Sequence, residues 1–452
     1  MRIALFVHCF FPTHFYGTET YTLQVARRLR EMGHDPVVVS ATFPGEPRRE
    51  RAVTMYRHDG LLVYCIDKNF IPRRRLKETY YQEDIRAILK GVLQEIRPEI
   101  VHVTHLLNHT AVLLEVVRDL RVPAVATLTD FFGFCYNNRL EAADGSLCRG
   151  PSTTRANCVA CHCKAFAQAN PHRKARLLAK PLWVSAAALG MTMVARVPGS
   201  RKTRLGRLVH DLRMRPDILH ACYQSYRAVI APTRFLRDAY VANGLALRWF
   251  DIRYGSDISR EPKPQRSPGT PVSFGFIGQL APHKGPDLLI DAFKRLPRGS
   301  CRLQIYGAED QAPVYAGALK RAAAGHAISF LGTFASEKMA EILAALDVVV
   351  IPSRWHENSP LVLLDALATH TPVVVCDVAG LTEFVDEGRS GFRFALGSVD
   401  DLTRVLSRFV DDSSLAATMS RTTQYTRTTR TMVEEILNVY EFARAAAACG
   451  SS

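Results

Sequence analysis

The sequence predicts two α/β domains, each with a parallel sheet that carries helices on both faces. Three observations support this prediction. Short apolar runs such as "RIALFV" and "IVHV" alternate with helical or irregular segments. The runs are apolar at nearly every position, which is typical of parallel strands buried on both faces. The alternation stops at "ISREPKPQRSPGTP", a linker-like segment rich in Pro, Ser and charge, and then restarts.

The first domain is expected over residues 1–255. Its first helix is predicted in "YTLQVARRLREMG", where Tyr21, Val25, Ala26 and Leu29 have helical spacing and Gly33 is a candidate C-terminal cap. The predicted strands are "RIALFV", "DPVVVS", "LLVYC", "IVHV", "AVATL" and "AVIAP".

The second domain is expected over residues 256–430, on the same plan. Its predicted strands are "VSFGFIGQ", "CRLQIYG", "AISFLG", "DVVVIPS" and "PVVVCD", and its helices are "DLLIDAFKRL", "KMAEILAAL" and "PLVLLDALATH". Two domains of this kind favour a ligand bound in a cleft between them.

Charge and hydropathy limit the partners and the compartment. The formal net charge is +15, so an anionic partner is expected: nucleic acid, an acidic membrane face or a phosphorylated substrate. "MRIALFVHCFFP" has a short apolar run and no small-residue cleavage site, so we interpret it as a strand and not as a signal peptide. No run reaches the length of a spanning helix. We therefore expect an intracellular protein.

A segment at about 164–218 interrupts the strand–helix pattern. Its apolar part, "PLWVSAAALGMTMVARVP", has basic flanks, and the stretch from His172 to Arg215 holds eleven Lys or Arg against one acid, Asp211. This composition predicts a helix at a membrane interface, beside anionic lipids. The alternative is a packed helical insertion with a solvated basic face. Nucleic acid is not the expected partner, because no aromatic platform or known reader motif accompanies the charge.

The stretch "DVVVIPSRWHENSPLVLLD" carries the main candidate site. Ser359 is a predicted N-cap, and Pro360 suits the first helical turn, so Glu357 would lie between a strand end and a helix start. Helix amides there would bind an anion. Glu357 would repel a phosphate unless it binds another part of the same ligand, such as sugar hydroxyls, and Asp365 could reach a ribose. The alternative is a solvated loop glutamate and a helix aspartate facing water. The candidate anion-binding residues are Asn358, Ser359, Pro360, Leu361 and Val362.

A second candidate loop precedes the first helix of the second domain. In "FGFIGQLAPHKGPDLLIDAF", Lys284 lies after a strand and before a helix, as a phosphate-binding lysine would. The loop is not a Walker A motif, because His283 occupies the position of the glycine before the lysine. A third loop, "VAGLTEFVDEGRSGFRF", follows the strand "PVVVCD".

With these loops, the sequence resembles the retaining nucleotide-sugar glycosyltransferases of family 4, which have the two-domain GT-B architecture. The resemblance covers nearly the whole chain and is most specific over residues 272–394. It implies that Glu357 binds hydroxyls of the donor sugar, and that Asp365, in place of a longer glutamate, binds the ribose. It also implies that Gly278, Gln279 and Lys284 lie at the diphosphate, although the family has arginine where this chain has Gln279.

The resemblance also places residues of the first domain. Gly17 matches a glycine-containing loop where backbone approaches the diphosphate. Thr129 stands where many members have a histidine, and Asp130 follows it; both are candidates beside the transferring sugar, although Asp130 could instead be a helix cap or a structural hydrogen-bond acceptor. Transfer in this family is usually assigned no protein base. Lys284 and the helix amides would hold charge on the leaving diphosphate while Glu357 orients the sugar.

Five cysteines cluster within residues 135–163. Cys158 and Cys161 form a CxxC pair, and Cys135 and Cys148 could complete a structural zinc site, with His162 and Cys163 as spare ligands. Reduced thiols without metal, an iron–sulfur cluster and a redox disulfide remain alternatives. The resemblance implies no metal or other cofactor for catalysis. Four histidines are expected to be loop or core residues and not ligands: His8, His14, His105 and His109.

The sequence thus predicts a retaining glycosyltransferase that moves a sugar from a nucleotide diphosphate donor to a glycan or lipid-linked acceptor in the N-terminal cleft. Bacterial cell-surface polysaccharide synthesis, in the cytoplasm and peripherally on the inner face of the membrane, is the expected setting. By resemblance, a helix within residues 431–452 would cross back to the first domain. The alternatives are another GT-B enzyme, a phosphorylase or sugar-nucleotide epimerase, and an inactive scaffold or nucleic-acid-binding protein.

Overall fold

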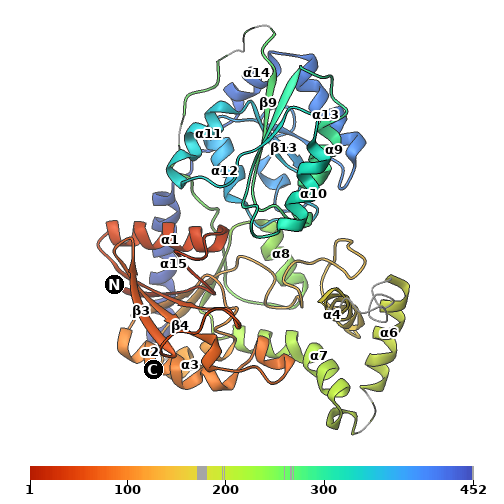
Figure 1. Ribbon diagram of the computed structural model, residues 1–452. Coiled ribbons are helices and arrows are strands. Elements are labelled where there is room, and N and C mark those ends of the chain that lie inside the picture. Colours follow the sequence, from red (N-terminus) through yellow and green to blue (C-terminus); the bar gives the residue numbers. More distant parts are fainter. Residues whose placement is uncertain are drawn as a thin grey trace. The chain divides into compact units, whose positions relative to one another are not determined.

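The computed structural model describes residues 1–169, 181–195, 197, 199–258, 260–264, 267 and 269–449. The chain separates into two compact units, residues 1–252 with 433–452, and residues 253–432. Each unit contains one sheet flanked by helices (Figure 1).

The sheet of the first unit has eight strands in the order β3-β4-β2-β1-β5-β6-β7-β8. All six predicted strands are confirmed, and β3 and β8 are additional. The bounds are β1 Arg2–Phe6, β2 Asp35–Ala41, β3 Val53–His58, β4 Leu61–Ile66, β5 Ile100–Val103, β6 Ala124–Thr127, β7 Ala228–Ala231 and β8 Trp249–Asp251.

The predicted parallel sheet is confirmed over seven of its strands, and at one edge the additional strand β3 runs antiparallel to β4. The two strands are joined by Asp59 and Gly60, both with positive φ (50° and 72°). Asp-Gly with this geometry is a strong hairpin signal. The edge strand escaped prediction because "VTMYRH" is half exposed and includes polar residues, so it has no apolar run.

Helices cover both faces of this sheet. α1 and α15 lie on one face, and α2 and α3 on the other (Figure 1). Tyr21 of α1 bonds to Thr127 (2.9 Å), and Tyr440 of α15 bonds to His102 (2.7 Å), which anchors both helices to buried polar groups of the sheet. The α-helices are α1 Gly17–Glu31, α2 Arg86–Ile96, α3 Val112–Asp119, α4 Ala156–Ala169, α6 Pro181–Val194, α7 Arg204–Tyr223, α8 Arg234–Ala242 and α15 Thr429–Cys449, and the 3₁₀ turns are η1 Lys68–Phe70, η2 Leu76–Thr79, η3 Glu83–Ile85 and η4 Ser200–Lys202.

The sheet of the second unit has six parallel strands in the order β11-β10-β9-β12-β13-β14. Helices α9, α10 and α13 lie on one face, and α11 and α12 on the other (Figure 1). The strands are β9 Val272–Ile277, β10 Cys301–Tyr306, β11 Ile328–Phe330, β12 Val348–Ile351, β13 Val373–Cys376 and β14 Gly391–Phe394. The helices are η5 Pro282–Lys284, α9 Pro286–Phe293, α10 Pro313–Ala323, η6 Ser336–Lys338, α11 Met339–Ala345, α12 Leu361–Ala368, η7 Thr382–Phe384, α13 Val399–Asp411 and α14 Leu415–Thr422.

Each sheet contains one point where the chain order reverses. In the first unit this point lies between β1 and β5, because β1 pairs with β2 on its other side. In the second unit it lies between β9 and β12, because β9 also pairs with β10. Ligands of open α/β sheets bind beyond the carboxyl ends of the strands at such a point. The residues that follow β1, β5, β9 and β12 are therefore where a site is expected.

Candidate active site

An ion pair spans the reversal point of the second sheet. Lys284 ends η5 in the loop after β9, and Glu357 lies in the loop after the neighbouring strand β12. Lys284 Nζ donates to Glu357 Oε1 over 2.6 Å. Because β9 and β12 are parallel neighbours, their following loops meet at one edge of the sheet. The two residues that the sequence selected separately are thus in direct contact.

Glu357 is a buried carboxylate with a fixed set of donors. Its side chain is 7% exposed, and Oε1 also accepts hydrogen bonds from Ser353 Oγ (2.5 Å) and Trp355 Nε1 (2.9 Å). Burial by itself would raise the pKa of Glu357, but Lys284 and these two donors outweigh it and lower the pKa. The interpretation as a solvated loop glutamate is excluded. Sequence reasoning missed Ser353 and Trp355, because nothing in the pattern shows where they point.

Lys284 keeps part of its ammonium group available. Its side chain is 24% exposed, and Nζ lies 5.1 Å from the centre of the Trp355 ring, within the range of a cation–π contact. The same loop carries Gly278, whose N–H donates to Tyr306 O (3.0 Å), and Gln279, which is exposed. A cation and a neutral hydrogen-bonding side chain therefore lie in the loop that follows β9.

Two glycines, not singled out by sequence reasoning, let the loops pack closely. Gly285 has φ +70°, and a Cβ there would lie 2.1 Å from Pro352 O. Gly380 has φ +86°, and a Cβ there would lie 1.5 Å from Glu357 O. Glu357 N also donates to Ala379 O (3.2 Å). The loops after β9, β12 and β13 are therefore interlocked, and Glu357 is held by backbone as well as by side chains.

The prediction that Ser359 is the N-cap of the following helix is wrong. Helix α12 begins at Leu361 with Pro360 in the cap position and no side-chain cap. Ser359 has φ +60°, a left-handed conformation, whereas an N-cap residue is extended. That conformation costs about 1–2 kcal/mol for a non-glycine residue. Its hydroxyl is buried and accepts or donates no hydrogen bond among the residues described. Strain of this kind concentrates at ligand-binding loops.

The start of α12 faces the same loop cluster. The first N–H groups of a helix, here from Leu361 and Val362, have no acceptor within the helix. With the helix dipole they favour a bound anion. Asn358, Ser359 and Pro360 form the turn that leads into them. The residues chosen for an anion site therefore follow one another directly, one to five residues after the ion-paired glutamate.

Asp365, in the second turn of α12, does not face open solvent. It is partly buried, and Oδ1 accepts a hydrogen bond from Ser256 Oγ (2.7 Å). Burial raises the pKa of Asp365 to about 6, with Ser256 lowering it and Asp257 raising it further. The interpretation as a helix aspartate turned to water is excluded.

In the first unit, the candidates after β6 form local hydrogen bonds. Thr129 Oγ1 donates to Thr104 O (3.1 Å). Asp130 Oδ1 accepts from Phe132 N (2.9 Å), and Oδ2 pairs with His105 Nε2 (3.0 Å). Burial alone would lower the pKa of His105, but the carboxylate of Asp130 outweighs it and raises the pKa. The sequence treated His105 as a loop or core histidine; its place directly after β5, next to β6, was the available signal.

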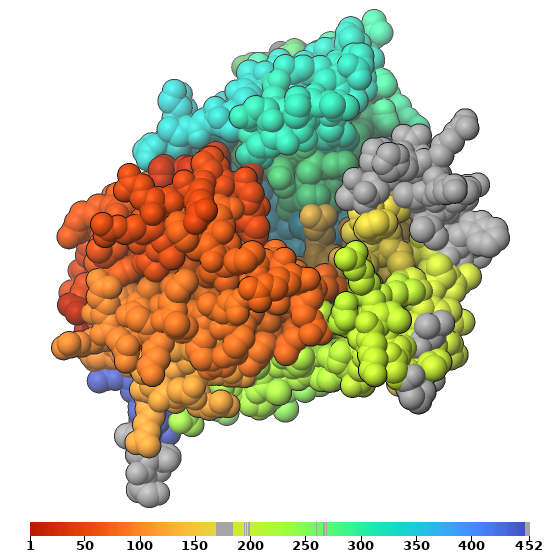
Figure 2. All heavy atoms as spheres, turned by 60° about the horizontal axis from the view of Figure 1, so that its bottom comes forward, coloured from red at the N-terminus to blue at the C-terminus, as the bar shows by residue number. Residues whose placement is uncertain are grey.

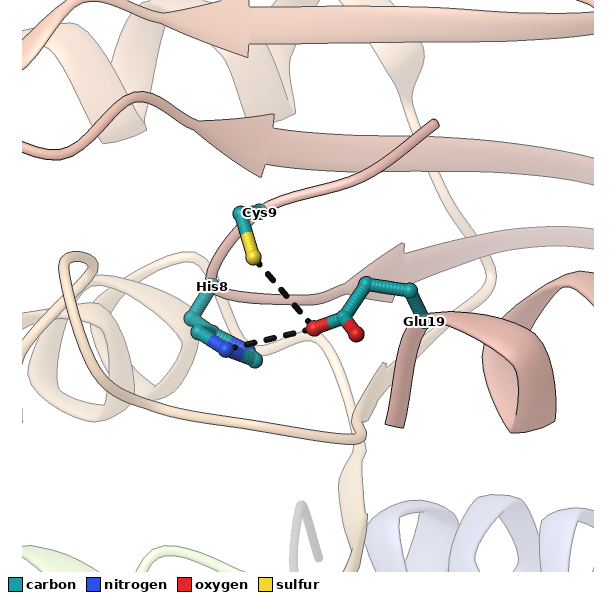
Figure 3. Close-up of side chains that lie close together, drawn as sticks. All are labelled: His8, Cys9 and Glu19. Atoms are coloured by element: carbon teal, nitrogen blue, oxygen red, sulfur yellow. Dashed lines mark hydrogen bonds and ion pairs between the residues drawn. The ribbon is translucent and has the colours of Figure 1, made fainter. Parts of the chain in front are cut away.

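A second polar cluster lies directly beyond β1. Figure 3 shows His8 and Cys9 pointing at Glu19, in the first turn of α1. Glu19 Oε1 lies 3.2 Å from His8 Nε2 and 3.3 Å from Cys9 Sγ, and no other group of described residues brings three metal-ligand atoms within 4.8 Å of one another. Burial and Glu19 raise the pKa of the Cys9 thiol, so the thiol stays protonated and donates. The cluster is therefore a hydrogen-bonded unit around one buried carboxylate.

Gly17 is the first residue of α1, in the first unit. A Cβ at Gly17 would meet no atom within 4 Å, so packing within this unit does not require glycine there. Its role in approaching a ligand remains an inference from resemblance.

The four cysteines proposed for zinc come from the loop between β6 and α4 (Cys135, Cys148) and from α4 itself (Cys158, Cys161). Asn157, in the first turn of α4, contacts the sulfur of Cys148 (3.8 Å), and Cys161 Sγ donates to Glu141 O (3.6 Å). Burial, Cys135 and Cys148 raise the pKa of Cys161 to about 12, and burial, Cys135, Cys161 and Cys148 raise the pKa of Cys158. No three of the four sulfurs, however, lie within 4.8 Å of one another. A tetrahedral zinc site would need these side chains to rotate, because Zn–S bonds are about 2.3 Å long.

Comparisons with known proteins agree with this geometry. Residues 257–426 match the family described as Glycosyl transferases group 1, and residues 15–169 match Glycosyltransferase Family 4. A GDP-mannose-dependent alpha-mannosyltransferase of Mycobacterium tuberculosis is 26% identical over 98% of this chain and 97% of its own. A D-inositol 3-phosphate glycosyltransferase of Stackebrandtia nassauensis is 33% identical, but over 34% of this chain and only 37% of its own length.

The fold is shared with solved structures. HepE of Anabaena, solved in complex with UDP and glucose, superposes with a TM-score of 0.60 at 16% identity, covering 97% of this chain and 99% of its own. Three findings lead to one assignment. They are the two parallel-sheet α/β units, the loops interlocked at the carboxyl ends of β9, β12 and β13, and both family matches. The chain is a glycosyltransferase of family 4, with the GT-B fold.

Proposed function

We propose that the enzyme is a retaining glycosyltransferase that uses a nucleoside diphosphate sugar as donor and a glycan or a lipid-linked sugar as acceptor. The observation that carries the proposal is the Lys284–Glu357 pair at the reversal point of the second sheet. A nucleotide sugar is a ligand with a diphosphate, which needs a cation, beside hydroxyls, which need an acceptor. One such ligand explains why both charges are placed side by side.

Glu357 has the acceptor capacity that this role needs. An ionised carboxylate offers about four lone-pair sites. Three donors converge on Oε1, whereas Oε2 accepts no hydrogen bond from the described residues. A donor-sugar hydroxyl would donate to Oε2 without displacing Ser353, Trp355 or Lys284. The low pKa of Glu357 keeps it an acceptor at neutral pH.

The diphosphate would lie against Lys284 and the start of α12. As the bond from the anomeric carbon to the β-phosphate oxygen breaks, negative charge grows on that oxygen. Lys284 Nζ and the N–H groups of Leu361 and Val362 would stabilise this charge, with the Gln279 amide contributing hydrogen bonds beside Gly278. The departing oxygen takes the proton of the acceptor hydroxyl on the same face as the new bond forms, so the configuration is retained and no protein base is required.

Asp365 would bind the ribose hydroxyls, and Thr129 and Asp130 remain our candidates beside the transferring sugar. The names of similar proteins, a GDP-mannose-dependent enzyme and a structure with UDP, support a nucleoside diphosphate donor but do not identify its base.

We propose a role in bacterial cell-surface polysaccharide synthesis, at the cytoplasmic face of the membrane, because the excess of positive charge suits an anionic, membrane-linked acceptor.

We also propose a structural zinc ion held by Cys135, Cys148, Cys158 and Cys161. It would tie α4 to the preceding loop. It takes no part in the transfer reaction.

Isothermal titration calorimetry with a panel of nucleoside diphosphates and the matching sugar conjugates tests the donor site. We expect one conjugate to bind at least tenfold more tightly than its free nucleotide. In Glu357→Ala this sugar-dependent gain should disappear while nucleotide binding remains, whereas Lys284→Ala should weaken both. Glu341→Ala, an exposed glutamate in α11 of the same unit, is the matched control and should match the wild type.

The proposal fails if no nucleotide sugar binds, or if Glu357→Ala keeps the full sugar-dependent gain. Product analysis with the conjugate that binds then decides the stereochemistry. Inversion at the anomeric carbon would refute the retaining mechanism and leave the donor site intact.

A further inference from the structure

Helix α6 presents an uncharged, apolar face to the outside of the first unit. Its fourteen residues, "PLWVSAAALGMTMV", include no charged side chain. Val184, Ala188 and Thr192 form a buried stripe with a spacing of four residues. On the other side, Leu189 and Met193, one turn apart, are 48% and 52% exposed. A helix that is apolar on its outward face as well is found in protein interiors or in contact with lipid.

The core beneath α6 does not depend on that outward face. α6 packs on α4 and α7 (Figure 1). The small core of these helices, which is separate from the core of the sheet, consists of Val159, Ala160, Val184, Ala188, Val209 and Leu212. Leu189 and Met193 are not part of it. Their exposure is therefore not a consequence of incomplete packing against this core.

Exposed apolar side chains are concentrated in this insertion. Elsewhere in the described chain, large apolar residues more than a third exposed lie singly, apart from the neighbouring pair Phe15 and Tyr16. Between residues 166 and 205 there are five of them: Phe166, Leu189, Met193, Val197 and Leu205. Figure 2 shows the yellow-green atoms of the insertion as a continuous part of the surface. Concentrated exposed apolar surface marks an interaction site.

The charge around this face has one sign. Basic side chains follow α6 directly, and four of them are exposed: Arg201, Lys202, Arg204 and Arg207. The one acid between His172 and Arg215, Asp211, is buried and points inward, where it accepts hydrogen bonds from Arg75 Nε and Lys77 N (both 3.0 Å). Asp217, farther along α7, is paired with Arg155. Within the described residues 184–217, no unpaired exposed acid therefore offsets the four basic groups.

We propose that the outward face of α6, with residue 197 and residues 199–207, together called the docking face, binds the surface of an anionic lipid bilayer. Leu189, Met193 and Val197 would enter the boundary between headgroups and acyl chains, while Arg201, Lys202 and their basic neighbours contact lipid phosphates. None of the described helices is long and apolar enough to cross a membrane, so this contact would be interfacial. The proposal is independent of the donor site: it can fail while nucleotide-sugar binding stands.

Vesicle flotation with the full-length protein tests the docking face. The probes are phosphatidylcholine vesicles with and without phosphatidylglycerol. We expect flotation with the anionic vesicles only, weakened by salt. The variant Leu189→Ser/Met193→Ser/Val197→Ser should bind at least tenfold more weakly. A matched control, Val314→Ser/Leu331→Ser/Leu396→Ser, removes three apolar residues of the second unit that are 85%, 47% and 42% exposed, and should bind as the wild type does.

Each outcome decides for or against lipid. Equal flotation of the α6 variant and the wild type would overturn the proposal, and so would equal binding to neutral and anionic vesicles. If the wild type does not float but is dimeric by light scattering, and the α6 variant is monomeric, the face pairs two copies of the chain instead. Because the three side chains lie outside the small core, the variant should keep its melting temperature, and nucleotide-sugar binding provides a second check that it is folded.

Discussion

Replacing Lys284 by alanine would leave a buried anion without its cation. Glu357 would keep hydrogen bonds from Ser353 and Trp355, but its side chain is only 7% exposed and could not gain full hydration. In the wild type, the folded-state pKa of Glu357 is below that of the unfolded chain, so ionisation adds stability above the unfolded pKa. In Lys284→Ala, burial would dominate and raise the folded pKa, so ionisation would now cost stability as the pH rises.

The structure sets the size of the effect. Breaking a buried ion pair by removing one partner costs about 3–5 kcal/mol. Lys284 is partly exposed and two neutral donors remain, so we expect about 2–3 kcal/mol at pH 8. Near pH 5 Glu357 in the variant can bind a proton, and the loss should fall to about 1 kcal/mol. For a unit of this size, a loss of 2–3 kcal/mol lowers the melting temperature by about 4–12 °C.

The assay uses the position of Trp355. It is the one tryptophan of the second unit, and its indole donates to Glu357. In a background with Trp183→Phe and Trp249→Phe, its fluorescence follows unfolding of this unit. Lys294→Ala is the matched control: Lys294 pairs with exposed Asp291 over 3.5 Å, and its loss should cost less than about 1 kcal/mol at either pH.

Two results would refute the reasoning. A loss for Lys284→Ala that is equal at pH 5 and pH 8 would mean that Lys284 does not control the ionisation of Glu357. Adding Glu357→Gln should recover most of the loss at pH 8, because the amide oxygen still accepts from Ser353 and Trp355 without a buried charge. A further loss instead would show that the two residues act separately.

Three other predictions follow from the same structure. Asp130→Asn should destabilise the first unit more at pH 6 than at pH 8.5. The pKa of His105 is raised, so the stability gained by ionising His105 beside Asp130 is present at low pH and lost as the pH rises. Urea denaturation at the two pH values measures the difference, and an equal loss of stability at both would contradict the His105–Asp130 pair. Asp365→Asn should raise the melting temperature of the second unit by a few degrees at pH 8 and by less at pH 5. With a pKa of about 6, ionisation of Asp365 costs stability above that pH, whereas the asparagine amide can still accept the hydrogen bond from Ser256. An unchanged or lower melting temperature at pH 8 would count against burial of the charge. Purified wild-type protein should contain one zinc per chain by elemental analysis and Cys158→Ser much less, whereas a metal-free wild type would favour reduced thiols.

Prediction from the sequence was most successful where a short pattern of apolar residues directly indicates a buried strand. The buried strands "IVHV" and "VVVI" are apolar at nearly every position and are found as β5 and β12. β3 was missed because an edge strand needs only one buried face, and its Asp59–Gly60 turn was the clearer signal. The N-cap of α12 was also predicted at the wrong residue. Ser359 has a side chain that is typical of an N-cap. Its backbone, however, is left-handed and not extended, in a loop that packs closely against the neighbouring loops, so it does not cap the helix.

By itself, the sequence determined the two α/β units, the loops that follow their strands, and the residues in those loops with the chemistry for a nucleotide sugar. These follow from hydrophobic periodicity and from the short spacing between a strand end and the next helix. Only the tertiary structure decided that Lys284 and Glu357 share one hydrogen bond, that Ser353 and Trp355 complete the shell, and that Asp130 pairs with His105. The partners in the two ion pairs lie in loops after neighbouring strands, 73 residues apart for Lys284 and Glu357 and 25 for His105 and Asp130. Periodicity along the chain shows which face of an element is buried, but not which loops strand order brings together.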